Sequence, residues 1–174
     1  MLKKIFLSLI AIGGVSVAGL WFEGRNAMNI EKDLSIKTSA ETLWNYLVDQ
    51  DLLMKWNPDI LKIEFPELRP VAKKGAKSKL FIREGANTTE YESEIVEFLP
   101  HQRLIVTLRA KTLGSSPMYV DYQLQSAGSQ MKMKYSATWQ PKEFKLRVLS
   151  PLIGVMAGKN AEATLEKLKQ LAEQ

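Results

Sequence analysis

Few side chains in this sequence are able to carry acid–base or metal chemistry. It contains one histidine, His101, and no cysteine. A single histidine excludes multi-histidine metal sites, and the lack of cysteine excludes disulfides, thiolate catalysis and cysteine zinc sites. His101 follows Pro100 in an expected turn, where we expect a solvated side chain. The sequence therefore predicts no metal site and no cofactor, and it assigns no catalytic residue.

Carboxylates at two places in the sequence are candidates for acid–base chemistry or cation binding. Glu90, Glu92 and Glu94 alternate along an expected strand, so they share one face. Such a row could serve acid–base chemistry or bind a hard cation, but the alternation is more typical of the solvated face of a strand. Asp121 lies among aromatic residues and is a candidate buried acid. In an enzyme, one or two polar groups such as Asp121 or Tyr135 could move protons.

Length and charge limit the classes of protein to consider. With 174 residues, 45% of them apolar, the chain suits one domain with a hydrophobic core. Its net charge of +5 is spread out, so nucleic acid is not an expected partner. Basic residues are densest in the loop region of Arg69, Lys73, Lys74, Lys77 and Lys79. There they either contact anionic lipid head groups or are simply solvated.

The N-terminus has the pattern of an export segment. Lys3 and Lys4 precede the uncharged stretch Ile5 to Phe22, which as a helix would be about 27 Å long, close to the apolar thickness of a bilayer. We expect a single-pass anchor in the inner membrane, with the domain facing the periplasm or exterior. The alternative is a cleaved signal peptide, because Ser16 to Ala18 is an acceptable small-x-small site. Residues 23–28 are the expected linker.

Residue patterns predict a strand, two short helices, a strand meander and a long helix. Thr38 and Glu41 have the spacing of a capping box for the first helix. The expected strands are 30–37, 60–65, 77–83, 88–99, 103–113, 119–125 and 130–139. The expected helices are 39–48, 50–55 and 142–173, with a kink or a restart at Pro151.

Period-2 patterning places aromatic and methionine side chains on the concave face of the predicted sheet. A curved sheet wrapped on one helix often leaves a cavity that a ligand can occupy, and methionine adapts to ligands of different shape. The alternative for each candidate is ordinary core packing. The candidate ligand-binding residues are Trp56, Tyr122, Met133, Tyr135, Trp139 and Met156.

The segment from Ser39 to Pro58 resembles the opening of START-like domains of the SRPBCC superfamily, polyketide cyclase/dehydrase and lipid-transport type. The residues that carry the resemblance are Ser39-Ala40-Glu41, Leu43-Trp44, Leu47, Asp49 and Trp56-Asn57-Pro58. The remaining elements follow in the same order, so the resemblance covers residues 29–174.

The resemblance implies an α+β helix-grip fold. In that fold a curved antiparallel sheet of about six to seven strands wraps a long C-terminal helix, and two short helices follow the first strand. It also implies a hydrophobic small molecule or lipid held between the sheet and the C-terminal helix. We therefore expect a binding or carrier protein tethered to the membrane by residues 5–22. The alternatives are a polyketide cyclase/dehydratase-like enzyme and an interaction module without a ligand.

Overall fold

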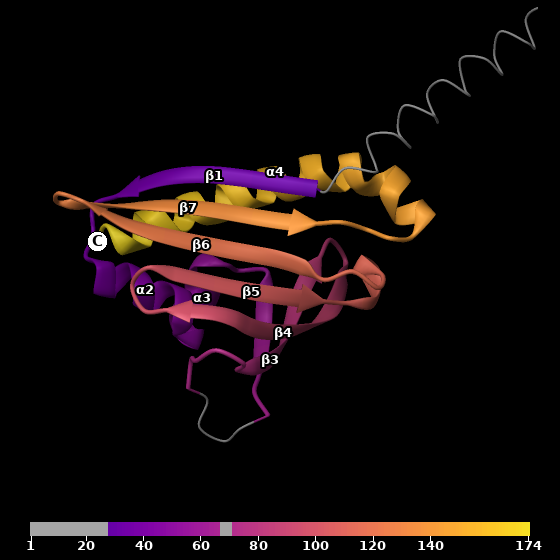
Figure 1. Ribbon diagram of the computed structural model, residues 1–174, viewed down its shortest axis with the longest axis horizontal. Helices are drawn as coiled ribbons and strands as arrows, with labels where there is room; N and C mark the ends of the chain where they lie inside the picture. The colour runs from indigo at the N-terminus through magenta and orange to yellow at the C-terminus, as the bar shows by residue number, and fades with distance from the viewer. Residues whose placement is uncertain (1–27, 67–70) are drawn as a thin grey trace, which may run out of the picture.

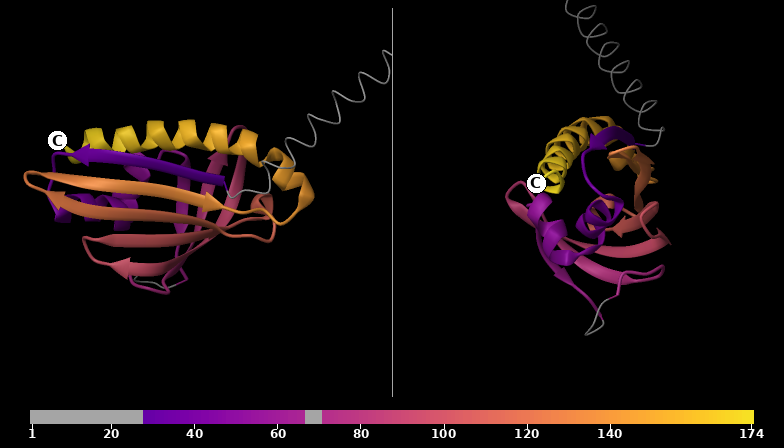
Figure 2. Two further views of the ribbon diagram at one scale, coloured as in Figure 1. Left: turned by 45° about the horizontal axis from the view of Figure 1, so that its top comes forward. Right: turned by 90° about the vertical axis from the view of Figure 1, so that its left-hand side faces the viewer.

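A computed structural model describes residues 28–66 and 71–174. In this part of the chain, seven strands form one antiparallel sheet in the order β1-β7-β6-β5-β4-β3-β2. The sheet curves around the helices (Figures 1 and 2). The strands are β1 (Met28–Ile36), β2 (Ile60–Glu64), β3 (Lys77–Glu84), β4 (Asn87–Leu99), β5 (Arg103–Arg109), β6 (Met118–Ala127) and β7 (Gln130–Trp139). This architecture confirms the predicted helix-grip fold.

The two short helices follow β1 as expected, but the first has a different cap. Helix α2 (Ala40–Val48) is capped by Ser39, whose Oγ accepts a hydrogen bond from the backbone N of Thr42 at 2.9 Å. The predicted Thr38–Glu41 capping box was therefore wrong by one residue. Ser39 has the extended backbone that an N-cap needs.

Helix α3 (Gln50–Trp56) starts immediately after α2. Asp49 ends α2 and caps α3, since its Oδ1 accepts from the backbone N of Asp51 and of Leu52, each at 2.9 Å. The two helices consequently meet at a sharp corner and lie under the concave face of the sheet (Figure 1).

The long helix α4 (Phe144–Ala172) continues through Pro151. Proline has no N–H to donate to the carbonyl of the residue four positions earlier, Arg147. The Oγ of Ser150 donates to that carbonyl instead, at 2.9 Å. The helix therefore does not restart at Pro151, which was one of the two expectations for this position; the other, a kink, is compatible with a continuous helix.

Strand β5 is shorter than predicted. It ends at Arg109, and residues Lys111–Leu113 form a 3-10 turn, η1. Gly114 closes that turn with a φ of 69°, a left-handed conformation that suits glycine. The indole Nε1 of Trp139 donates to the carbonyl of Leu113 at 3.2 Å, which fixes the turn against the end of β7.

The buried side chains form two clusters along α4. The C-terminal half of α4 packs with α2, α3 and the ends of β1 and β7 around Leu43, Trp56 and Met133. The N-terminal half packs on the other end of the sheet around Ile30 and Trp139. Both clusters lie on the concave side, where the candidate cavity must also lie.

The expected membrane segment (residues 5–22) and the linker residues before Met28 lie outside the described residues. Within residues 28–66 and 71–174, no helix is both long enough and apolar enough to cross a membrane.

Candidate ligand-binding cavity

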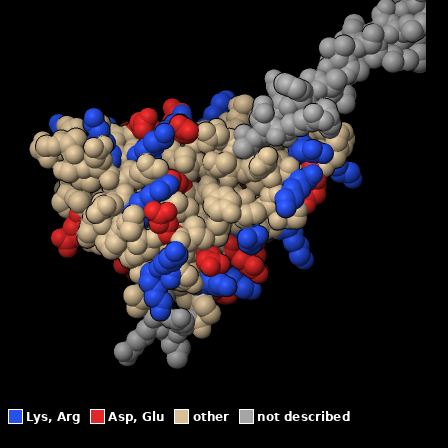
Figure 3. Space-filling model, viewed as in Figure 1, with Lys and Arg blue, Asp and Glu red and all other residues tan. Residues whose placement is uncertain are grey.

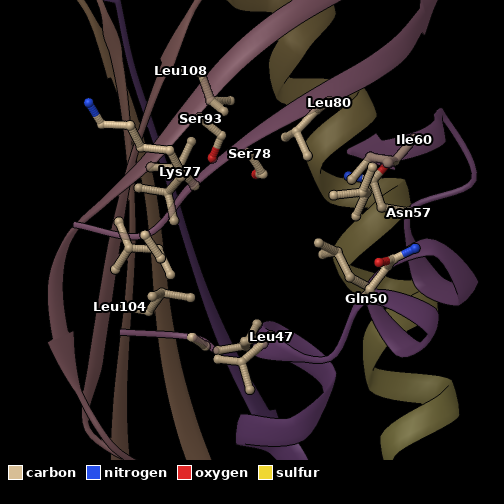
Figure 4. A pocket seen from close by; sticks show the side chains of 18 of the residues that line it. Leu47, Gln50, Asn57, Ile60, Lys77, Ser78, Leu80, Ser93, Leu104 and Leu108 are labelled. Carbon is tan, nitrogen blue, oxygen red and sulfur yellow. The ribbon is translucent and has the colours of Figure 1, made fainter. Parts of the chain in front are cut away.

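A cavity of about 510 Å³ lies between the concave face of the sheet and the helix pair α2–α3 (Figure 4). Most of its wall is aliphatic. Side chains contributed by strands are Ile60, Ile63, Lys77, Ser78, Leu80, Ile82, Ser93, Ile95, Leu104, Val106, Leu108, Met118, Val120, Tyr122 and Tyr135. Those contributed by helices and loops are Leu47, Val48, Asp49, Gln50, Leu53, Asn57, Phe65, Pro66, Val71, Ala72 and Ala76.

The position of the helices explains why this space stays open. Helix α4 packs mainly against β1, at one edge of the sheet. Near the opposite edge of the sheet, the concave face is covered by the two-turn helix α3. This helix is too short to fill the space inside the curved sheet. No residue of α4 lines the cavity. The cavity therefore lies between the sheet and α3, whereas the resemblance implied a ligand held against the C-terminal helix.

Two tyrosines form the deep polar part of the wall. Tyr122 and Tyr135 are register partners on β6 and β7, and their ring centroids are 5.4 Å apart. Neither hydroxyl makes a hydrogen bond to any of the described residues. Neither oxygen is among the fully buried polar atoms that lack a partner, so both hydroxyls reach the open space of the cavity, where they are available to a polar atom of a ligand.

Burial also sets the ionisation of this pair. It raises the pKa of Tyr135 to about 12, and it raises the pKa of Tyr122 further, with the neighbouring Tyr135 adding to the effect. Both phenols are therefore protonated at neutral pH. They can donate hydrogen bonds but cannot act as bases.

Two serines supply polar groups on another part of the wall. Ser78 and Ser93 are register partners on β3 and β4 and share the concave face. In Figure 4 both hydroxyls point into the hollow, opposite Gln50 of α3 and Asn57, the residue that follows α3. The cavity thus offers neutral hydroxyl and amide groups at separate points of an apolar wall.

Charged groups occur only at the rim. Among the lining residues of the described chain, Asp49 is the one carboxylate and Lys77 the one cation. The Asp49 carboxylate caps α3, and Lys77 lies 3.9 Å from Glu94 on the outer face. Neither side chain is placed as a general base inside the cavity.

With this geometry in hand, comparison with known proteins identifies the family. Residues 37–173 match the family described as Activator of Hsp90 ATPase homolog 1-like protein. The chain belongs to this family. Comparison with curated proteins finds no match.

Solved structures of other proteins share the fold of this family member. A START superfamily protein from Mycobacterium smegmatis superposes with a TM-score of 0.67 at 15% identity, covering 84% of this chain and 97% of that chain. Protein CV1439 from Chromobacterium violaceum gives 0.64 at 15% identity, covering 84% and 97%. DynU16, a protein in the dynemicin biosynthetic locus, gives 0.60 at 12% identity, covering 84% of this chain and 47% of that chain. At these identities the likeness establishes the fold, and it confirms the START-like fold that was expected.

The structure brings two of the six predicted binding residues, Tyr122 and Tyr135, to the cavity wall. Trp56, Met133 and Trp139 are at most 2% exposed and fill the core beside the cavity. Trp56 also donates from its Nε1 to the carbonyl of Tyr46 at 2.8 Å, which ties the end of α3 to α2.

Met156 lies outside the cavity, with 62% of its surface exposed on the outer side of α4. Its apolar character suggested the concave side, but α4 carries apolar residues on two faces. Sequence patterns did not identify Ser78 and Ser93 as cavity residues. A signal was present, because the alternation along each strand puts these serines on the face of the sheet opposite to that of their charged neighbours.

The acidic candidates lie on the convex face of the sheet, where charges of both signs are interspersed (Figure 3). Glu90 pairs with Lys79 at 2.7 Å and Glu94 with Lys77 at 3.9 Å. This agrees with the solvated-face interpretation. No group of acidic or histidine side chains in residues 28–66 and 71–174 could hold a metal ion.

Asp121 also lies on the convex face, paired with Arg103 through Nε at 3.1 Å and Nη2 at 2.8 Å. Burial alone would raise its pKa, but the hydrogen bonds from Arg103 and Gln123 outweigh burial and hold the pKa below its usual value. Asp121 and Tyr135 therefore point to opposite sides of the sheet and do not form a proton-transfer pair. His101 is exposed in its turn, as expected.

The predicted basic loop is divided between two environments. Lys77 and Lys79 belong to β3 and face Glu94 and Glu90, so their charges are matched. Lys73 and Lys74 are exposed in the loop before β3, and Arg69 lies outside the described residues.

Proposed function

We propose that this protein binds a neutral, largely apolar small molecule in the cavity beneath α3, and that it holds this molecule rather than converting it. The observation that carries the proposal is an aliphatic cavity of about 510 Å³ with two unpartnered phenol groups. That volume falls within the roughly 300–1,000 Å³ of typical small-molecule sites. The START-like fold is consistent with such binding.

The wall chemistry restricts the ligand. Burying an unpaired charge is costly, and the interior of the cavity provides no charged partner. A carbonyl, ether or hydroxyl oxygen, by contrast, would accept hydrogen bonds from Tyr122 and Tyr135. We therefore infer a neutral ligand with an apolar body and at least one acceptor oxygen near this pair.

We also propose that residues 5–22 tether the domain to the inner membrane, with the domain facing the periplasm or exterior. The support is the uncharged apolar run preceded by Lys3 and Lys4. The alternative remains a secreted or periplasmic protein after signal cleavage.

A polyketide cyclase/dehydratase-like enzyme is the second candidate. It is favoured by the paired phenols and by the structural likeness to DynU16 from a biosynthetic locus. Acid–base chemistry also needs a base, and the rim carboxylate of Asp49 already accepts two backbone hydrogen bonds. Binding without conversion is therefore the better-supported function.

Extraction of bound molecules from the purified full chain, followed by mass spectrometry, tests the proposal. Ser93→Phe places a large ring in the cavity, and Glu92→Phe places the same ring on the convex face of the same strand as a control. We expect a neutral apolar molecule in the wild type and in Glu92→Phe, with at least a tenfold loss in Ser93→Phe. Equal amounts in all three proteins would refute binding in this cavity. A second species that forms on incubation would support the enzyme instead.

A further inference from the structure

The N-terminal half of α4 exposes an apolar surface on the side away from the sheet. Its five large side chains are each between 49% and 62% exposed. We call this surface the outer α4 patch: Phe144, Leu149, Leu152, Val155 and Met156.

The outer α4 patch does not contribute to the core. The opposite side of the same helix segment packs inward through Leu146, Ile153 and Ala157. The segment is therefore apolar on two faces, and folding of the domain uses only one of them. Contiguous exposed apolar surface on a folded domain usually marks an interaction site.

The patch ends abruptly along the helix. Continuing on the outer side toward the C-terminus, the exposed residues become Lys159, Glu162, Glu166 and Lys167. The second half of α4 is thus an ordinary amphipathic helix, and only the first half presents apolar residues to the outside. The exposed large apolar side chains of α4 therefore all lie between Phe144 and Met156.

The exposed side chains of Lys142, Lys145 and Lys159 flank this apolar surface, whereas Arg147 is half-buried with its Nε inside the fold. Residues 142–160 contain Lys142, Lys145, Arg147 and Lys159, but a single carboxylate, Glu143. The Glu143 carboxylate stays ionised and is held toward the loop after η1, because its Oε1 accepts from the backbone N of Ser115 at 2.8 Å. An apolar face with flanking lysines is the composition of helices that lie in the interface of an anionic bilayer.

The course of the chain places this patch beside the end of the domain nearest the expected anchor. Met28, the first described residue, lies against Gly154 of α4, so close that a Cβ on Gly154 would come within 3.2 Å of Met28 Cγ. The five residues 23–27 can span at most about 18 Å when fully extended. If residues 5–22 form the membrane anchor proposed above, this end of α4 must lie near the bilayer surface.

We propose that the outer α4 patch docks on the surface of an anionic lipid bilayer, with its apolar side chains at head-group depth and its lysines among the phosphates. The membrane contact thus lies on one side of the domain. The segments flanking the β2–β3 loop, which border the cavity, lie on the side opposite α4 in Figure 1.

The absence of cysteine allows a direct test on the full chain. Met156→Cys carries an environment-sensitive nitrobenzoxadiazole label, and Glu166→Cys carries the same label on the polar half of α4 as a matched control. Each protein is placed at one chain per disc in lipid nanodiscs of phosphatidylcholine with phosphatidylglycerol, with or without brominated lipid.

We expect at least twofold quenching by brominated lipid at position 156 and none at 166. We also expect the quenching to weaken in discs without phosphatidylglycerol or when Lys145→Glu is added. No quenching at 156, equal quenching at both positions, or chains that do not associate with the discs would overturn the proposal. An emission change at 156 that appears only with several chains per disc would assign the patch to a second copy instead. Ligand content in the Ser93 variants is a separate readout, so failure of either proposal can be recognised.

Discussion

The rings of Tyr122 and Tyr135 meet at an interplanar angle of 57° with their centroids 5.4 Å apart. Both line the cavity, and both hydroxyls lack a partner among the described residues. Elsewhere on the sheet, polar side chains that face inward are rare. This pair is therefore the feature of the cavity most able to orient a ligand.

Replacing either hydroxyl with hydrogen should weaken ligand binding and leave the stability of the fold almost unchanged. Tyr122→Phe and Tyr135→Phe each remove a donor that has no protein partner, so we expect the free energy of unfolding to change by less than about 0.5 kcal/mol. Affinity for a neutral carbonyl-bearing ligand should fall about 2- to 10-fold per hydroxyl. Affinity for a hydrocarbon of similar size should not change, which isothermal titration with the two ligands can measure.

A loss of stability above about 1 kcal/mol in these variants would show that the hydroxyls have protein or water partners in the folded state. An equal loss of affinity for both ligands would indicate a change in cavity shape rather than a lost hydrogen bond.

Alkaline pH should destabilise the fold through the same residues. In the unfolded chain a tyrosine ionises near its ordinary pKa of 10.0, whereas burial raises the pKa of Tyr135 to about 12. The stability that comes from keeping this phenol neutral is complete below pH 10 and is lost as the pH rises toward 12. A difference of this size corresponds to at most about 2 kcal/mol, because Tyr135 is half-buried and borders a cavity that water can enter.

Absorbance titration at 295 nm and melting temperatures measured from pH 9 to 12 check this expectation. The Tyr122→Phe/Tyr135→Phe variant should lose less stability than the wild type over this range, and its absorbance change near pH 12 should be smaller. Identical profiles for the two proteins would contradict the raised pKa.

Ser150 and Pro151 should be energetically coupled. Ser150→Ala leaves the Arg147 carbonyl without its donor at this point of α4, so we expect a loss of about 1 kcal/mol in the free energy of unfolding. In the background Pro151→Ala, the new backbone N–H can donate to the same carbonyl. The cost of Ser150→Ala should then fall below about 0.5 kcal/mol. Equal costs in both backgrounds would show that the serine acts independently of the proline.

Local patterns were sufficient to predict most of the fold. Strand alternation and the order of the elements indicated the meander, and the segment from Ser39 to Pro58 carried the START-like resemblance. The errors were local. Thr38 and Ser39 can both cap a helix, and only the backbone conformation decides between them. The period of α4 could not separate Leu152 from Ile153, because the helix is apolar on both its inner and its outer side.

The cavity was harder to predict than the fold. Trp56, Met133 and Trp139 are large and apolar, and the same properties suit a core residue and a cavity residue. Whether space remains beside them depends on the curvature of the sheet and on the length of α3. Both are properties of the whole folded domain rather than of a local sequence pattern. Ser78 and Ser93 carry a clearer signal, since a small polar residue on the concave face leaves room without filling it.

The most direct test of the central claim is probe binding to two matched variants of β5. Val106 lines the cavity and its neighbour Ile105 lies on the other face of the strand, so Val106→Trp fills the space and Ile105→Trp does not. Binding of the neutral apolar probe N-phenyl-1-naphthylamine to the full chain in nanodiscs is measured by fluorescence, with empty discs subtracted. We predict saturable binding to the wild type and to Ile105→Trp, and affinity at least tenfold weaker for Val106→Trp. Equal affinity in all three proteins would contradict a ligand site in this cavity.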